Sequence, residues 1–308
     1  MDLIADIGAT NSRCALLDEH GAIARSNRFL NHDFESLADL LGTFADGAKL
    51  TRAALAIAAP ITGEEVAMTN VDWRFRQADL KHALELETLR VLNDFEAVAR
   101  SLPLLDDGDC HGIGGGDPAQ GTRAVLGPGS GLGVAAIVPH GEGWTTVSGE
   151  GGHVTLPAQN DVEALVIAEH ADADGHCSAE RLLSGPGLVR IHASLARDAG
   201  MEAESLTPAD VSERMLGRDA TACRAYSVFF ALLGTVAGNL ALTVGARGGV
   251  YIAGGIVPRV IDALEQSDFR ERFVAKGRYR SYLESIRTAV ITLDEPAFPG
   301  LRASLGYN

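Results

Sequence analysis

Polar side chains that could handle a hydroxylated ligand occur at three places in this sequence. Asn93-Asp94 follows an apolar, strand-like run and precedes a helical pattern, Glu150 and His153 flank two glycines in SGEGGHV, and Glu180 precedes the turn LLSGPGL. Three carboxylates, an amide and an imidazole can each pair with hydroxyl groups, so the set suits a polyhydroxylated molecule. Simpler explanations stay open: Asp94 as a helix N-cap, and Glu and His as solvated loop residues.

Two glycine-rich turns could hold phosphate. Asp6–Thr10 reads DIGAT and Gly129–Gly133 reads GSGLG, each between two strand-like runs. Successive backbone N–H groups in such a turn form a concavity for an anion, and a carboxylate at Asp6 could hold Mg²⁺ or its waters nearby. Neither turn is a Walker A motif. The second is also not a dinucleotide-binding fingerprint, because a β-like run follows it where the fingerprint requires a helix. Glycine in a plain hairpin for steric reasons alone remains the alternative.

The elements that must position these residues alternate between strands and helices, which predicts an α/β fold. Leu3–Leu17 and Ala124–Val138 share one strand–turn–strand pattern, as two similar halves would produce. Gly108–Gly121 is predicted to be a boundary loop or hinge. The predicted strands are Leu3–Asp6, Arg13–Leu17, Ala53–Ala59, Leu89–Leu92 and Gly249–Pro258, and the predicted helices are Asp79–Leu86, Phe95–Leu102, Asp161–His170, Gly187–Ala199, Pro208–Leu216, Ala220–Leu242 and Ile261–Glu265.

Composition excludes several classes of function. The 308 residues carry a net charge of −15, which is poorly suited to nucleic acid or an anionic membrane. The 4 cysteines lie far apart, so neither a zinc site nor a disulfide framework is indicated, and the start does not read as a secretory signal. The uncharged run 225–246 contains Gly234 and Gly238 as a GxxxG and permits two interpretations, a membrane span or a buried core helix with a close neighbour. Asn239 within it and the strand pattern after it favour the core helix.

Seven motifs occur in the order seen in the proteobacterial-type bacterial glucokinases: DIGATNSR, AAPITGEEVAMTNVDWRF, LNDFEAVARSLPLL, LGPGSGLGVA, SGEGGHVTL, ERLLSGPGLV and LALTVGARGGVYIAGGIVP. The chain resembles this family, part of the hexokinase/actin/heat-shock ATPase superfamily, over essentially its whole length. The resemblance implies a two-lobed actin-like ATPase (ribonuclease H-like) α/β fold with a duplicated β-hairpin/α core and an inter-domain cleft. It implies a small domain of residues 1–104 plus 294–308 and a large domain of 105–293.

The resemblance also implies an activity, transfer of the γ-phosphoryl group of ATP to the 6-hydroxyl of glucose. Asp94 would be the catalytic base, and the sugar would contact Asn93, Asp94, Glu150, His153 and Glu180. ATP would contact Ala5, Asp6, Ile7, Gly8, Ala9 and Thr10 in the first turn, Gly129, Ser130, Gly131 and Gly133 in the second, and Gly254 and Gly255 near the adenosine. Mg²⁺ would lie near Asp6, held through water.

The chain departs from the family pattern at three positions. The family more usually has glycine at Ala5 and Ala9 and a small residue other than proline at Pro128, and a methyl group at Ala9 would narrow the space for a phosphate. The resemblance further implies a homodimer with glucose and ATP as its small-molecule substrates. The scattered cysteines and the start of the chain favour a cytoplasmic location, and the acidic composition disfavours a nucleic acid or membrane partner. Two competing hypotheses are another phosphotransfer enzyme on the same fold, such as an acetate kinase or a polyphosphate phosphatase, and a non-catalytic sugar sensor.

Overall fold

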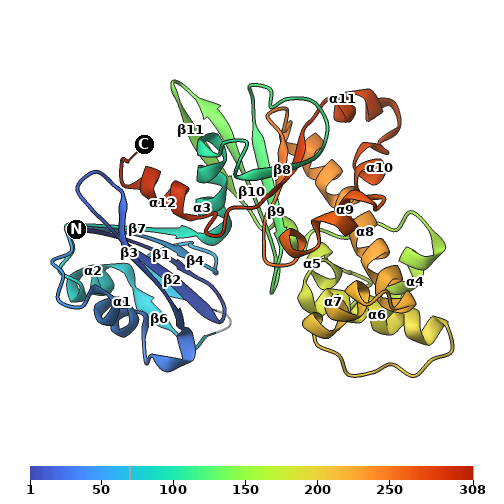
Figure 1. The fold of residues 1–308 in the computed structure, drawn as a ribbon, viewed down its shortest axis with the longest axis horizontal. Helices are drawn as coiled ribbons and strands as arrows, with labels where there is room; N and C mark the ends of the chain where they lie inside the picture. The colour runs from blue at the N-terminus through green and yellow to red at the C-terminus, as the bar shows by residue number, and fades with distance from the viewer. Residues whose placement is uncertain (69–70, 308) are drawn as a thin grey trace. The chain divides into compact units, whose positions relative to one another are not determined.

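Strands and helices alternate along residues 1–68 and 71–307, the part of the chain that the computed structural model describes (Figure 1). Thr69 and Asn70, in one of the seven motifs, lie outside the described residues. The chain divides into a first unit, Met1–Asp106, His140–Ser148 and Leu293–Asn308, and a second unit, Asp107–Pro139 and Gly149–Thr292. Residues 140–148 thus differ from the sequence-based division, which placed them in the large domain. They pack in the first unit, where the Thr146 hydroxyl donates to Glu96 over 2.9 Å.

The first unit contains a five-stranded sheet in the order β3-β2-β1-β4-β7. Strands β1, β2 and β3 form an antiparallel meander, and β4 and β7 run parallel to β1. The register sets Ile7, Ile57 and Asn93 in one row, so β1, β4 and β7 end at the same edge of the sheet. The strands are β1 (Asp2–Ile7), β2 (Asn11–Leu17), β3 (Ile23–Leu30), β4 (Arg52–Ile57) and β7 (Thr88–Asn93).

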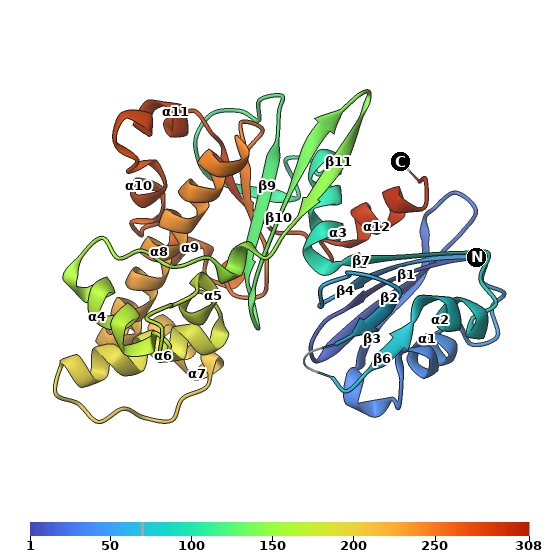
Figure 2. The same ribbon diagram turned by 180° about the vertical axis from the view of Figure 1, so that it is seen from behind.

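Helices cover both faces of this sheet because side chains along β1 alternate between the faces. Leu3, Ala5 and Ile7 pack with α1 and α2 in one apolar core. On the opposite face α12, from the end of the chain, lies beside α3 (Figures 1 and 2). Gly300 makes this approach possible, because a Cβ there would overlap the carbonyl oxygen of Ala97. The helices are α1 (Leu37–Ala45), α2 (Gln77–Ala83), α3 (Asp94–Ser101) and α12 (Phe298–Ser304), with a small ribbon of β5 (Glu65–Ala67) and β6 (Arg74–Arg76).

The second sheet repeats the pattern of the first. Its order is β11-β10-β9-β12-β13-β8, with β9 and β10 antiparallel and β12 and β13 parallel to β9. The hairpins β1–β2 and β9–β10 therefore hold equivalent places, as the repeat of Leu3–Leu17 in Ala124–Val138 predicts. The strands are β8 (Cys110–Gly114), β9 (Arg123–Pro128), β10 (Leu132–His140), β11 (Gly143–Ser148), β12 (Val250–Ile252) and β13 (Thr288–Ile291).

Strand β8 corrects the prediction that Gly108–Gly121 is only a loop or hinge. It pairs antiparallel with β13, with Cys110 opposite Ile291. Glycine-rich, polar residues have low intrinsic strand propensity, so this strand exists because β13 presents an unpaired edge to it. A segment more than a hundred residues away along the sequence supplies that edge.

A long central helix, α8 (Ala220–Val244), organises the core of the second unit. Gly234 and Gly238 lie against α10 (Phe269–Val274), since a Cβ at either position would overlap the carbonyl oxygen of Phe269 or Phe273. The GxxxG therefore serves close packing inside the unit. Among the described residues α8 is also the one helix long and apolar enough to cross a membrane, and most of its apolar stretch is buried in the structure.

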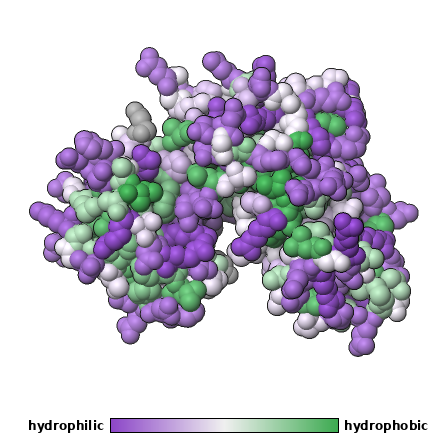
Figure 3. Space-filling view, in the orientation of Figure 1, coloured by the Kyte–Doolittle hydropathy of each residue, from purple (hydrophilic) through white to green (hydrophobic). Residues whose placement is uncertain are grey.

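The remaining helices of this unit surround α8 and the sheet. They are α4 (Asp161–His170), α5 (Ala179–Leu182), α6 (Gly185–Asp198), α7 (Pro208–Leu216), α9 (Ile261–Glu265) and α11 (Arg280–Glu284). The short helices α10 and α11 were not predicted from the sequence. On the face drawn in Figure 3, hydrophilic side chains cover most of the surface, in keeping with the 41 acidic and 26 basic residues.

Candidate active site

Asp94 is the first residue of α3 and directly follows the end of β7. The N-cap of α3 is Asn93, whose Oδ1 accepts from the backbone N–H groups of Phe95 at 3.0 Å and Glu96 at 3.3 Å. Asn93 Nδ2 donates to the carbonyl of Ala59 over 3.2 Å. Asn93 therefore caps the N-terminus of α3, and the simpler explanation that Asp94 is the N-cap is wrong. Asp94 is left at the carboxyl edge of the sheet, where ligands of open α/β sheets bind.

The protein environment raises the pKa of Asp94 from its usual 3.8 to about 7. Burial is the largest cause and the negative charge of Asp6 is the second, while a hydrogen bond from the Phe95 amide opposes both. Its Oδ1 accepts that hydrogen bond over 2.9 Å. A carboxylate that changes protonation near neutral pH is suited to accept a proton from a substrate.

The first glycine turn is held in shape by its own backbone and by Asn31. Gly8 N–H donates to the Asn11 carbonyl over 3.0 Å, and Asn31 Nδ2 donates to the Gly8 carbonyl over 2.9 Å. Within residues 1–68 and 71–307, the amides of Ala9 and Thr10 have no protein acceptor. These two N–H groups are therefore available to an anion.

Three residues predicted for this turn, Ala5, Asp6 and Ile7, lie in β1 instead. Ala5 and Ile7 are fully buried in the apolar core. Their side chains point away from the face that carries Asp6. The methyl group of Ala5 consequently fills core space, whereas Ala9 is part of the turn itself.

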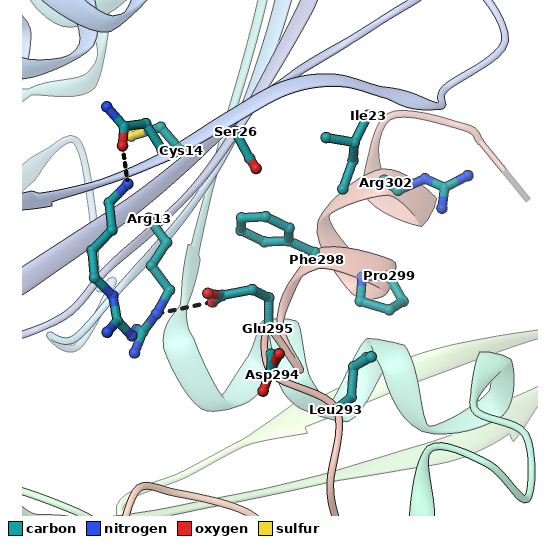
Figure 4. Close-up of a pocket in the computed structure, with 12 residues that line it drawn as sticks. Arg13, Cys14, Ile23, Ser26, Leu293, Asp294, Glu295, Phe298, Pro299 and Arg302 are labelled. Atoms are coloured by element: carbon teal, nitrogen blue, oxygen red, sulfur yellow. Dashed lines mark hydrogen bonds and ion pairs between the residues drawn. The ribbon is translucent and has the colours of Figure 1, made fainter.

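Asp6 shares its face of the sheet with Arg13, its cross-strand partner on β2. Arg13 Nη1 donates to Asp6 Oδ2 over 3.3 Å. Burial raises the pKa of Asp6, and the charges of Arg13 and Arg28 oppose that rise. Arg13 Nε also lies 3.0 Å from Glu295 Oε2, an ion pair drawn in Figure 4.

A cavity of about 470 Å³ adjoins this ion pair. Figure 4 shows Ser26 and Phe298 facing each other across it, with Arg13 and Glu295 at one end. Sequence reasoning missed Arg13 and Glu295. The β1–β2 hairpin places Arg13 opposite Asp6, so the predicted hairpin could have indicated Arg13. No sequence signal indicates Glu295, which lies near the other end of the chain.

In the second unit, Glu180 lies against the second glycine turn. Its Oε2 accepts from the backbone N–H of Leu132 over 2.8 Å. A Cβ at position 131 would overlap the same oxygen, so Gly131 makes this contact possible. Among the described residues the amides of Ser130 and Gly131 have no protein acceptor, as in the first turn.

Glu150 precedes, and His153 ends, a single helical turn, Gly151–His153, which packs on the start of β10. A Cβ at Gly152 would overlap the Leu132 carbonyl, so the glycines allow this approach. His153 Nε2 lies 3.9 Å from Glu150 Oε2, and both side chains are more than half exposed. The Ala179 amide donates to the Val154 carbonyl over 2.9 Å and ties this turn to the residue before Glu180.

Gly254 and Gly255 lie beside the second turn. Gly254 has φ +85°, and a Cβ there would overlap the carbonyl oxygen of Pro128. A Cβ at Gly255 would meet no other atom within 4 Å, so the space there is open. The turn at Gly129 and the Gly254-Gly255 loop thus form one glycine-lined surface, as a bound nucleotide would need. Pro128 supplies the carbonyl at this contact.

The predicted residues therefore fall into two sets, one in each unit. The first unit brings together the first turn, Asp6, Asn93 and Asp94 at one edge of its sheet. The second unit brings together the second turn, Glu150, His153, Glu180 and the Gly254 loop.

The donor set fits Mg²⁺ held mainly by phosphate and water. Among residues 1–68 and 71–307 there is no group of three or more His, Cys, Asp or Glu side chains able to hold a metal ion. Asp6 and Asp94 are close enough that the charge of one raises the pKa of the other, and a cation would relieve that repulsion. Mg²⁺ usually binds through one or two carboxylates plus substrate phosphates, which matches this arrangement.

Known proteins match the chain over its whole length. The glucokinase family model covers residues 3–307. The glucokinase of Nitrobacter hamburgensis is 44% identical, over 97% of this chain and 95% of its own. The crystal structure of a glucokinase from an Antarctic psychrotroph superimposes with a TM-score of 0.87 at 34% identity, covering 100% of this chain and 99% of that one.

A more distant structure shows the fold alone. A ROK family glucokinase from Streptomyces griseus, in complex with glucose and AMPPNP, has a TM-score of 0.68 at 17% identity, covering 99% of this chain and 98% of that one. The α/β architecture is that of the actin-like ATPases. With the family model matched from residue 3 to residue 307 and relatives more than 40% identical, the chain belongs to the glucokinase family.

Proposed function

We propose that this chain transfers the γ-phosphoryl group of ATP to the 6-hydroxyl of D-glucose, giving glucose 6-phosphate and ADP, with Asp94 as the general base. The observation that supports it most is the pKa of Asp94, raised to about 7 at the carboxyl edge of a parallel strand. A carboxylate whose pKa lies near 7 accepts a proton more favourably at neutral pH than an ordinary surface aspartate does. Membership of the glucokinase family supports the substrate pair.

Asp94 would accept the proton of the sugar hydroxyl as that hydroxyl attacks the phosphorus atom. Phosphoryl transfer passes through a loose transition state, so positioning and charge stabilisation dominate the rate. Asn93 contributes by capping α3, which fixes the Asp94 backbone at the sheet edge. The Phe95 amide holds one Asp94 oxygen and thereby orients the carboxylate.

The other polar residues of the site would orient the sugar so that its 6-hydroxyl faces Asp94. We assign Asn93, Glu150, His153 and Glu180 to the other hydroxyls of glucose. Glu180 is restrained by its bond to the Leu132 amide, so its remaining oxygen has a defined direction. His153 and Glu150 are exposed and lie on a glycine-supported turn that a ligand can approach.

The phosphates would bind to the unpaired amides of the two glycine turns. Ala9 and Thr10 supply them in the first turn, and Ser130 and Gly131 in the second. Gly254 and Gly255 would face the adenosine. Mg²⁺, when bound with ATP near Asp6, supplies positive charge to the transferring phosphoryl group. A homodimer in the cytoplasm, with the two units acting as the small and large domains, completes the proposal.

The competing hypotheses separate in one assay. ADP release is measured with and without glucose, using Asp94→Asn as the matched variant. Glucose-dependent release supports the kinase, and glucose-independent release supports a phosphatase-like or ATPase activity. Binding of glucose or ATP without release supports a sensor. A panel of hexoses in the same assay then tests the preference for glucose.

A further inference from the structure

Glu295 lies beside Arg13 of β2, although it belongs to the segment between β13 and α12. Its Oε2 is 3.0 Å from Arg13 Nε, and its side chain is 32% exposed. The same guanidinium donates from Nη1 to Asp6 Oδ2 over 3.3 Å. One cation is therefore shared between two carboxylates.

We propose that Glu295 is a positioning residue for Asp6, acting through Arg13, and that it keeps the Asp6 carboxylate available to the cation that accompanies the nucleotide. The inference rests on the proposed function, in which Asp6 lies next to Mg²⁺. Glu295 touches neither substrate nor Asp6 in this role. It acts by competing for Arg13.

The geometry of the shared guanidinium supports competition. The contact to Asp6 is long for a charge-assisted hydrogen bond, which is commonly 2.7–2.9 Å, and it uses one Asp6 oxygen. The Arg13 Nε–Glu295 pair is close in distance, yet neither atom forms an aligned hydrogen bond with the described residues. Arg13 thus clamps neither carboxylate with the parallel, two-bond geometry that arginine can adopt.

The backbone around Glu295 is anchored, so its side chain has a fixed starting point. Ser101 Oγ donates to the Pro296 carbonyl over 2.6 Å and accepts from the Gly300 amide over 2.8 Å. Ser101 is the last residue of α3, the helix that begins at Asp94. The segment carrying Glu295 is therefore tied to the element that carries the proposed base.

Without the negative charge of Glu295, Asp6 would be the remaining carboxylate paired with Arg13. Arg28, the neighbour of Arg13 across β2 and β3, adds a second positive charge on this face. The guanidinium would then turn toward Asp6 and hold it more tightly. The cavity of about 470 Å³ beside the pair leaves room for that rotation.

The test measures ADP binding by titration calorimetry, with glucose present, in the absence and presence of Mg²⁺. The quantity of interest is the dissociation constant of ADP without Mg²⁺ divided by the dissociation constant with Mg²⁺. This ratio reports how strongly the binding of the cation and the binding of the nucleotide favour each other. For Glu295→Gln we expect this ratio to fall roughly three- to tenfold, as for the loss of one charged contact. ADP binding without Mg²⁺ should be unchanged or tighter, and glucose affinity unchanged.

Asp294→Asn is the matched control, because Asp294 is the neighbouring carboxylate, lines the same cavity, and makes no ion pair with Arg13 within the described residues. It should leave the ratio at the wild-type value. Arg13→Lys retains the charge but carries all its N–H groups on one nitrogen, so it cannot place separate nitrogens at the two carboxylates as Nε and Nη1 do, and it should lower the ratio as Glu295→Gln does. In an Arg13→Met background, Glu295→Gln should have no further effect.

Three results would overturn the inference. If Glu295→Gln weakened ADP binding equally with and without Mg²⁺, Glu295 would have a general structural role. An Asp294→Asn ratio as low as that of Glu295→Gln would mean that bulk charge is responsible. A full effect of Glu295→Gln in the Arg13→Met background would remove Arg13 from the pathway. Failure of the proposed function itself has another signature, namely no ADP binding by the wild-type protein.

Discussion

Asp94→Asn should stabilise the folded protein at alkaline pH while it removes activity. Folding raises the pKa of Asp94 from 3.8 to about 7, so between these values the folded state holds a proton that the unfolded state has lost. The wild-type free energy of unfolding therefore falls as pH rises from about 4 to about 7. Asparagine carries no charge and can still accept from the Phe95 amide, so the variant avoids this loss.

The size of the effect follows from the shift. A tenfold change in proton affinity is about 1.4 kcal/mol, so the full shift from 3.8 to about 7 is at most about 4 kcal/mol at pH 8. Water reaches part of this half-buried side chain and screens its charge, so we expect about 1–2 kcal/mol. At or below pH 4 the difference between the two proteins should vanish.

Urea denaturation followed by tryptophan fluorescence measures this directly, because both tryptophans of the chain, Trp73 and Trp144, lie in the first unit with Asp94. Midpoints are compared at pH 4 and pH 8 without substrates, with the exposed Asp72→Asn as the control. If Asp94→Asn is no more stable than the wild type at pH 8, or its advantage is the same at both pH values, the reasoning about its burial is wrong.

The kinetic side of this substitution is independent of stability. Loss of a general base typically lowers turnover by about 10²- to 10⁴-fold, whereas sugar binding should survive. In the wild type, kcat/KM for glucose should rise with pH through about 7, because only the ionised carboxylate accepts a proton. Near-normal turnover in the variant would refute the catalytic assignment.

Three further substitutions test the rest of the site and its scaffold. Glu180→Gln should mainly raise KM for glucose, and an unchanged KM in initial-rate assays would remove Glu180 from the sugar site. Gly131→Ala should push the Glu180 carboxylate away from the Leu132 amide and raise the same KM without unfolding the protein, as circular dichroism can check. Gly300→Ala should lower the unfolding free energy by about 1–3 kcal/mol, because its methyl group meets the Ala97 carbonyl between α12 and α3. Equal stability of Gly300→Ala and wild type in urea would contradict that packing.

Local pattern alone determined the two hairpins, the strand that ends at Asn93, and α8. Hydrophobic periodicity and glycine spacing are properties of short segments, and packing in the folded chain agrees with them. The GxxxG of α8 predicted a close neighbour, although not that the neighbour would be α10. The presence of Asp94 at a strand end was also readable, but its neutral-range pKa was not, because burial and the charge of Asp6 both depend on how β1 and β7 are placed in one sheet.

Other features exist only through tertiary contacts. Strand β8 forms because β13 presents an edge, so its glycine-rich sequence reads as a loop in isolation. The contact of Glu180 with the turn at Gly131 joins segments about fifty residues apart. Glu295 meets Arg13 because the chain returns to the first sheet at its C-terminal end, and no periodicity or motif records such a return. Electrostatics and long-range pairing depend on distances in space, which a linear sequence does not contain.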